Sequence, residues 1–165
     1  GVNNFPTHTI IDGHFRGVLE ETGMSVRKEY EMVALARRMD LFSIVYVGSP
    51  DEAAEMARAG ADAIIAHVGT TVGGSIGVKS AVVSWEHTLQ TTQDIIQAAT
   101  QVRQDIFFFA HGGPINTPED AARVINATAC VGFVGASSLE RMGVEESLTN
   151  LTRRFTALTL PAAKS

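Results

Sequence analysis

The chain has 165 residues, 45% of them hydrophobic and 19% charged, which excludes an intrinsically disordered protein and suffices for one domain with a sizeable core. Its formal net charge of −5 at pH 7 provides no basic surface, so we expect no nucleic-acid partner. The single cysteine, Cys130, excludes an intrachain disulfide, and its apolar neighbours predict a buried thiol. The sequence has no long apolar run and no signal-peptide pattern, so we expect a cytoplasmic protein that enters no membrane.

The first part of the chain is predicted to hold a short strand and a long polar loop. Residues 2–5 form the strand candidate, which Pro6 ends because proline cannot extend a strand ladder. The loop covers Thr7–Met24, and loops of this length are often functional. Its polar side chains are candidates for a lid over a ligand site, although solvated surface charge would explain them as well: His8, Asp12, His14, Glu20 and Glu21.

The next elements alternate between helix and strand. A helix is predicted over residues 26–40 from apolar residues at i, i+3, i+4 and i+7. Residues 42–47 are β-branched and aromatic, which predicts a buried parallel strand. Residues 49–52 have the capping-box pattern of a helix that ends at Gly60, and 61–68 is the next strand. The apolar stripe of the first helix consists of Met32, Leu35, Ala36 and Met39.

The second half of the chain repeats this alternation. Ser84 can cap a long helix, and Ile106–Ala110 follows it as a strand. Residues 117–120 supply a threonine N-cap, a proline at the first helical position and two acids, which predicts a helix before the strand Val131–Gly135. A final amphipathic helix is indicated by apolar residues spaced by four and three: Val144, Leu148, Leu151, Phe155 and Leu158.

An internal similarity supports this assignment of elements. Segments 49–69 and 117–137 align without a gap through cap, proline, acids, alanines and strand, which favours a common supersecondary unit. Five strands with helices between them are compatible with two architectures. One is a five-stranded doubly wound sheet, and the other is the last five units of a (β/α)8 barrel, which typically needs about 250 residues. Both place ligands beyond the carboxyl ends of the strands.

Five motifs occur in order along nearly the whole chain: VNNFPT with IDG, LEETGM, AHVG with GGSIG, HGGPI, and GASSLER. Together they resemble the phosphoenolpyruvate hydrolase-like family. The resemblance implies that residues 1–160 are the C-terminal part of one TIM-barrel domain, a (β/α)8 barrel, followed by a tail at 161–165. It also implies that about the first three of the eight βα units are absent from this sequence.

Glycine-containing loops are the candidates for anion binding. Barrels often hold phosphate at the last two loops, which here are Gly112-Gly113 and Gly135-Ala136-Ser137-Ser138. Glycine lets backbone N–H groups approach an anion, although it would equally permit tight strand-to-helix turns. The glycine-rich loop 69–77 is a weaker signal because it is not a dinucleotide fingerprint. The expected anion-binding residues are Asn4, Gly73, Gly74, Ser75, Gly112, Gly113, Gly135, Ser137, Ser138 and Arg141.

Two histidines that end predicted strands, His67 and His111, are the candidates for acid–base catalysis. Two imidazoles facing one pocket could act as general acid and base or bind a metal, whereas a single strand-end histidine is often only a core residue. Glu140 is the third catalytic candidate, and its neighbour Arg141 offers a fork for a carboxylate unless the two form a local salt bridge. His87 is expected to be structural. No cofactor is specified; a divalent metal is compatible with the resemblance, but related barrels often carry metal-binding carboxylates in early strands that this sequence lacks.

We therefore expect an enzyme-type site that acts on a small anion, such as phosphoenolpyruvate or another 2-oxo acid derivative, by hydrolysis or lyase-type cleavage. The alternative is a non-catalytic barrel that senses a small ligand and signals through partner contacts. Because five units cannot close an eight-stranded barrel, we also expect exposed edges and a homo-oligomer or another association that covers the open side.

Overall fold

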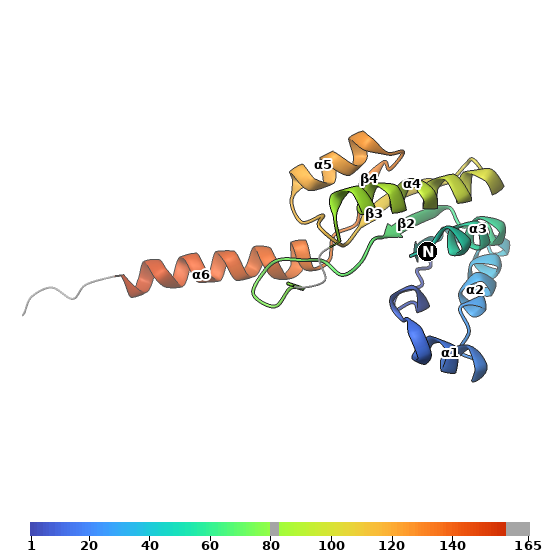
Figure 1. Cartoon of the computed structure of the whole chain (residues 1–165), viewed down its shortest axis with the longest axis horizontal. Coiled ribbons are helices and arrows are strands. Elements are labelled where there is room, and N and C mark those ends of the chain that lie inside the picture. The colour runs from blue at the N-terminus through green and yellow to red at the C-terminus, as the bar shows by residue number, and fades with distance from the viewer. Residues whose placement is uncertain (80–82, 158–165) are drawn as a thin grey trace, which may run out of the picture.

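The computed structural model describes residues 1–79 and 83–157 and contains a parallel four-stranded sheet (Figure 1). The strands lie in the order in which they occur along the chain, and each pairs with the next in parallel register. They are β1 (Ile44–Val47), β2 (Ala63–His67), β3 (Phe107–His111) and β4 (Gly132–Phe133).

Helices connect the strands and extend the chain at both ends. Before β1 lie η1 (His8–Ile10), α1 (Gly13–Glu21) and α2 (Arg27–Arg38). Between strands lie α3 (Pro50–Ala59), α4 (Trp85–Val102) and α5 (Pro118–Ala127). After β4 come η2 (Ser138–Met142), which has π-helical hydrogen bonding, and α6 (Gly143–Thr156).

One face of the sheet is covered by helices, and this arrangement identifies the fold. Alternate strand residues, among them Val45, Ile64 and Phe108, join one hydrophobic core with residues of α2, α3, α4 and α5. A doubly wound sheet would carry helices on both faces and reverse its strand order at a switch point. Sequential parallel strands with helices on one side are instead the arrangement of a (β/α)8 barrel, of which this chain supplies consecutive units.

The helix starts that we predicted from capping residues are confirmed. Ser49 Oγ, Ser84 Oγ and Thr117 Oγ1 each accept the N–H three residues later, at 3.2 Å. Thr117 and Asp120 form the complete capping box, and Gly60 ends α3 in the left-handed conformation. The two similar segments are indeed equivalent units, α3–β2 and α5–β4.

The N-terminal prediction was partly wrong. Residues 2–5 make only one bridge, between Val2 and Ser43, because the Asn4 carboxamide replaces the main chain and bonds both the N–H and the C=O of Tyr46. The predicted loop Thr7–Met24 contains η1 and α1. Phe15, Val18 and Leu19 in α1 have the i, i+3, i+4 spacing of a helix, which the loop prediction overlooked, although α1 buries none of its residues.

Other boundaries and faces also differ from the prediction. The predicted apolar stripe of α2 only partly faces the core. Ala36 is buried, but Met39 is 60% exposed, and Val33, which was not part of the stripe, is fully buried in the core. The strand predicted at 131–135 shortens to β4, whereas the expected burial of Cys130 is confirmed. Among the described residues, no helix is long and apolar enough to cross a membrane.

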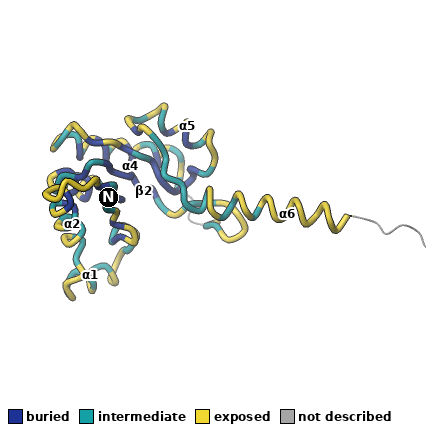
Figure 2. The backbone as a smooth tube through the Cα atoms, turned by 180° about the vertical axis from the view of Figure 1, so that it is seen from behind, coloured by how far each residue is buried: buried dark blue, intermediate teal, exposed yellow. Residues whose placement is uncertain are grey.

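Helix α6 extends away from the rest of the molecule (Figure 1). Its apolar residues Val144, Leu148, Leu151 and Phe155 have the predicted spacing, but all four are exposed, and the tube of α6 is mostly yellow in Figure 2. Leu158, the last residue of the predicted stripe, and the predicted tail 161–165 lie outside the described residues.

Candidate functional site

His67 and His111 are neighbours at the carboxyl ends of adjacent strands. They are register partners in the β2–β3 ladder, so their side chains project from the same face of the sheet, opposite the helices. Their ring centroids are 5.1 Å apart. The two predicted histidines therefore do lie side by side at the carboxyl ends of their strands, but only His67 is among the residues that line the hollow described below.

Tyr46 completes a cluster of three rings on this face. Its ring lies edge-on to His111, with 5.1 Å between centroids, and 6.1 Å from the centroid of His67. Asn4 positions Tyr46 by accepting its N–H at 2.7 Å and donating to its C=O at 3.0 Å. Burial raises the pKa of the Tyr46 phenol, so the hydroxyl is neutral at pH 7.

The two histidines have different Nδ1 partners, and these define complementary tautomers. His111 Nδ1 lies 2.7 Å from the carbonyl oxygen of Val134, which can only accept, so this Nδ1 carries the hydrogen. The Gly69 N–H donates to His67 Nδ1 at 3.3 Å, so this Nδ1 is the acceptor. In the neutral rings, His67 Nε2 is consequently a donor and His111 Nε2 an acceptor.

The surroundings keep both rings neutral. Burial, reinforced by the neighbouring His111, lowers the pKa of His67 to about 4. Burial also lowers the pKa of His111, against the opposing effect of its hydrogen bond to Val134. At neutral pH the pair thus presents one imidazole base and one imidazole N–H donor side by side.

A hollow of about 320 Å³ lies next to His67, beyond the carboxyl ends of β1 and β2. Its size suits a small molecule. His87, which we expected to be structural, also lines this hollow, from the first turn of α4, and its Nε2 lies 3.3 Å from Thr91 Oγ1. The complete lining is Thr9, Ile10, Gly48, His67, Val68, Gly69, Thr70, His87 and Thr91.

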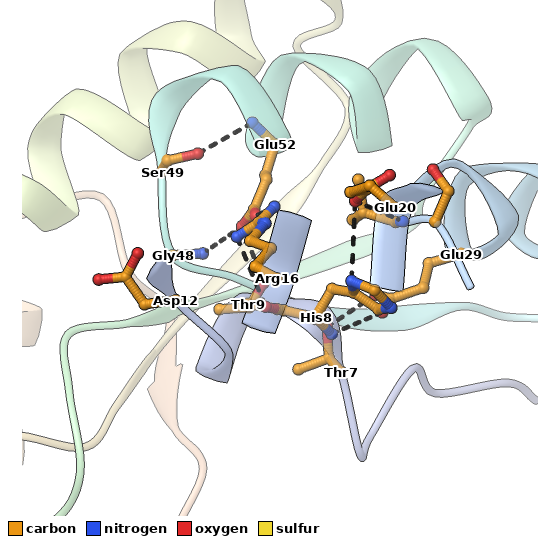
Figure 3. Close-up of polar contacts among 12 residues, drawn as sticks. Thr7, His8, Thr9, Asp12, Arg16, Glu20, Glu29, Gly48, Ser49 and Glu52 are labelled. Carbon is orange, nitrogen blue, oxygen red and sulfur yellow. Dashed lines mark hydrogen bonds and ion pairs between the residues drawn. The ribbon is translucent and has the colours of Figure 1, made fainter. Parts of the chain in front are cut away.

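Glu52 forms a second polar centre at the same edge, which the sequence reading missed. Only 6% of Glu52 is exposed, and its carboxylate accepts hydrogen bonds from Thr9 Oγ1 (2.8 Å), the Gly48 N–H (2.9 Å) and Arg16 Nη2 (2.7 Å) (Figure 3). It borders a hollow of about 390 Å³, which shares Thr9 and Gly48 with the hollow beside His67. The capping pattern concealed this role, because Glu52 bonds the Gly48 N–H rather than the Ser49 N–H.

The residues predicted as a lid make mostly local contacts, and His8 bonds the body of the molecule through its backbone N–H. The His8 N–H donates to Glu29 Oε1, and His8 Nδ1 is 3.7 Å from Glu20 Oε1 (Figure 3). Asp12 caps α1, whereas His14 and Glu21 are exposed on it. Together with the Arg16–Glu52 ion pair, these contacts hold η1 and α1 beside the carboxyl end of β1.

Gly112 and Gly113 pack two loops together in this structure. Both have positive φ, and a Cβ on Gly112 would lie 2.1 Å from the Gly69 carbonyl oxygen. The Gly113 N–H donates to that same oxygen at 2.9 Å, so this N–H is engaged within the protein. The structure thus shows the tight-turn role of these glycines, and their binding of an anion stays a prediction.

The remaining predicted site residues lie on and around η2 and the loop after β2. Gly135 packs against Leu139, Ser137 is the N-cap of η2 without a side-chain capping bond, and Ser138 begins η2. Glu140 is exposed. Arg141 turns to Glu145 and to the loop that contains Gly73, Gly74 and Ser75, rather than to Glu140.

The sequence left a divalent metal possible, and the described part of the chain shows which side chains could bind one. Within residues 1–79 and 83–157, no three His, Cys, Asp or Glu side chains come together in a way that could hold a metal ion. The pair His67 and His111 could supply two ring nitrogens from one face of the sheet, which is fewer than the three groups that such a metal site requires.

The strand order, the one-sided helices and the polar side chains at the carboxyl ends of the strands define a protein of the (β/α)8-barrel class. The chain belongs to the phosphoenolpyruvate hydrolase-like family, whose profile matches residues 1–158.

The relatives are much longer than this chain. It is 47% identical over 161 residues to the ToMV resistance protein Tm-1(GCR237) and to the ToMV susceptible protein tm-1(GCR26) of Solanum lycopersicum, and this match covers 97% of the chain but 21% of theirs. It is 30% identical over 152 residues, or 92% of the chain and 25% of the other, to a Sinorhizobium fredii protein named "Putative transcriptional regulatory protein y4pA". The chain therefore spans about a fifth to a quarter of the length of these relatives.

Among solved structures, similar chains are found at low identity. The N-acetylmannosamine-6-phosphate 2-epimerase of Clostridium perfringens matches with a TM-score of 0.44 and 19% identity, over 77% of this chain and 47% of that chain. NadC of Streptococcus pyogenes matches with a TM-score of 0.44 and 20% identity, over 74% and 34% of the two chains.

Proposed function

We propose that this chain contributes the acid–base site of a phosphoenolpyruvate hydrolase-like barrel enzyme, which cleaves a small phosphorylated or 2-oxo acid by hydrolysis or lyase-type chemistry. The observation that carries the proposal is the pair of neutral histidines with complementary tautomers at the carboxyl ends of β2 and β3.

The two imidazoles have different roles. His111 Nε2 accepts a proton from the attacking water or from a substrate hydroxyl, and its Nδ1–H, anchored on Val134, stabilises the imidazolium that forms. His67 Nε2–H donates a hydrogen bond to the substrate oxygen on which negative charge develops. In lyase cleavage, the electrons of the broken bond move toward that oxygen, and His67 stabilises the resulting enolate.

Histidine variants of the full-length protein test this proposal. His111→Gln and His67→Gln should each lower turnover of phosphoenolpyruvate or a 2-oxo acid by about 10²–10⁴, with little change in the thermal unfolding midpoint. His14→Gln, which removes an exposed histidine of α1, is the matched control. Unchanged turnover in both site variants would rule out the acid–base role.

The second candidate function is ligand sensing without turnover, which the names of the relatives favour, since one is a resistance protein and another is named as a regulatory protein. Calorimetric binding of phosphoenolpyruvate to the full-length protein, with no product formed during prolonged incubation, would favour sensing over catalysis.

A further inference from the structure

The loop after β2 binds a carboxylate of its own chain. The Ser75 N–H donates to Glu145 Oε2 at 2.9 Å, and Ser75 Oγ donates to Glu145 Oε1 at 2.8 Å. Each oxygen of one carboxylate thus receives its own donor from a single residue. These two bonds are the main cause of the lowered pKa of Glu145, which is therefore ionised at neutral pH.

Arg141 completes this set of donors. Its Nη1 lies 3.2 Å from Glu145 Oε1 and 3.4 Å from Oε2, and its Nη2 donates to the Gly73 carbonyl at 3.3 Å. A backbone N–H, a hydroxyl and a guanidinium around one carboxylate are the groups by which proteins bind carboxylate ligands.

The loop is shaped for these side chains. Gly74 has a φ of 72°, and a Cβ there would lie 2.2 Å from Arg141 Nη1 and 3.0 Å from Glu145 Oε2. Glycine is thus required both for the conformation and for the close approach.

The position of Glu145 allows its carboxylate to move away from Ser75 and Arg141. It belongs to the first turn of α6, which extends away from the body, and its side chain is 30% exposed (Figure 1). A hollow of about 490 Å³ opens beside it, lined by Gly74, Ser75, Met142, Glu145, Glu146, Thr149, Asn150 and Arg153. A small acid has room to approach the same donors from this side.

We infer that Ser75, the Gly73–Gly74 turn and Arg141 form a binding site for the carboxylate of a small 2-oxo acid, and that Glu145 is an internal occupant which this ligand displaces. The choice of a 2-oxo acid rests on the proposed function, whereas the choice of a carboxylate rests on the paired oxygens of Glu145. Displacement couples ligand binding to the release of α6 from the loop.

Calorimetry on the full-length protein tests this site, with pyruvate as the probe and inorganic phosphate as the comparison. The titrations use a His111→Gln background, which leaves the site at Ser75 and Arg141 intact and lowers turnover. Glu145→Ala should bind pyruvate about tenfold more tightly, because the site is no longer partly filled from within. Ser75→Ala and Arg141→Gln should weaken binding by a similar factor.

Glu146→Ala is the matched control, since it removes the adjacent negative charge of α6 from a residue that makes no hydrogen bond to the loop among the described contacts. Equal gains in Glu145→Ala and Glu146→Ala would mean that only net charge matters and would overturn the inference. A gain for phosphate alone would overturn the carboxylate assignment. If pyruvate affinity is unchanged in Glu145→Ala while His111→Gln in the wild-type background lowers turnover as expected, the inference about the Ser75 site fails and the proposed function stands.

Discussion

At the scale of single residues, the environment of each histidine decides its chemistry more than its position on a strand. His67 and His111 end equivalent strands, but a backbone N–H meets one Nδ1 and a backbone carbonyl meets the other. The Val134 carbonyl comes from the chain just beyond β4, 23 residues from His111. The tautomer of His111 is consequently set only once the chain is folded and the Val134 carbonyl lies beside the His111 ring.

The lowered pKa of His67 predicts a specific pH response. The folded protein keeps His67 neutral down to about pH 4, whereas an unfolded chain protonates histidine near its ordinary pKa of 6.5. Between these values the unfolded state binds more protons, so the contribution of His67 to the unfolding free energy is full above pH 6.5 and is lost as pH falls toward 4. An NMR titration of labelled histidines in the full-length protein should show a midpoint near pH 4 for the resonance that disappears in His67→Gln. A midpoint near 6.5 would contradict the burial of this ring.

Two glycines should respond in opposite ways to alanine. Gly112→Ala should destabilise the protein strongly, because its φ is 84° and the new Cβ would meet the Gly69 carbonyl oxygen. Gly17→Ala in α1 should stabilise it by about 0.5–1 kcal/mol, since nothing lies within 4 Å and the residue is helical. Denaturant unfolding of the two variants measures both effects. Equal tolerance at both positions would show that the Gly69–Gly112 contact is absent in solution.

At the scale of elements, the starts of α3, α4 and α5 each use a side-chain cap formed between residues close in the sequence. Thr117→Ala should lower the unfolding free energy by about 1 kcal/mol, because the Asp120 N–H loses its acceptor at the start of α5. Thr117→Ser keeps the hydroxyl and should restore most of this loss. Chemical denaturation of the three proteins gives the comparison, and an equal loss in both variants would assign the effect to the threonine methyl group instead.

The same contrast between local and distant contacts explains how much the sequence revealed. Caps, the Gly60 stop and strands β1 to β3 follow from neighbouring residues and hydrophobic pattern, so they were predictable. The pairing of Asn4 with Tyr46 spans 42 residues, and the Arg16–Glu52 ion pair spans 36, so neither leaves a local pattern. At the candidate site, the two histidines could be selected from the sequence because each ends a predicted strand. Tyr46 and Glu52 could not, because Tyr46 fits the apolar pattern of its strand and Glu52 fits a helix-capping pattern.

At the scale of the whole molecule, the sheet is open. Within the described ranges, 1–79 and 83–157, β4 pairs only with β3, and Phe107 on the face opposite the helices is 57% exposed. Residues 1–165 expressed alone should therefore associate or lack fixed packing, because open parallel edges and exposed apolar residues favour pairing with other chains. Size-exclusion chromatography with near-UV circular dichroism measures this, and a rigid monomer of 17.6 kDa with cooperative unfolding would contradict it.

The central position of β2 has a consequence for the order in which the molecule opens. β2 is paired on both sides and four of its five residues are buried, with Ile64 and Ala66 in the core that β2 shares with α3 and α4. Its amide hydrogens should exchange with solvent only through the largest opening event, together with those of β1 and β3, whereas the amides of α6 should exchange through local fraying. The unit from β1 to β3 would thus behave as one cooperative block, which carries His67 and His111 at its edge and keeps them together while the outer helices open and close.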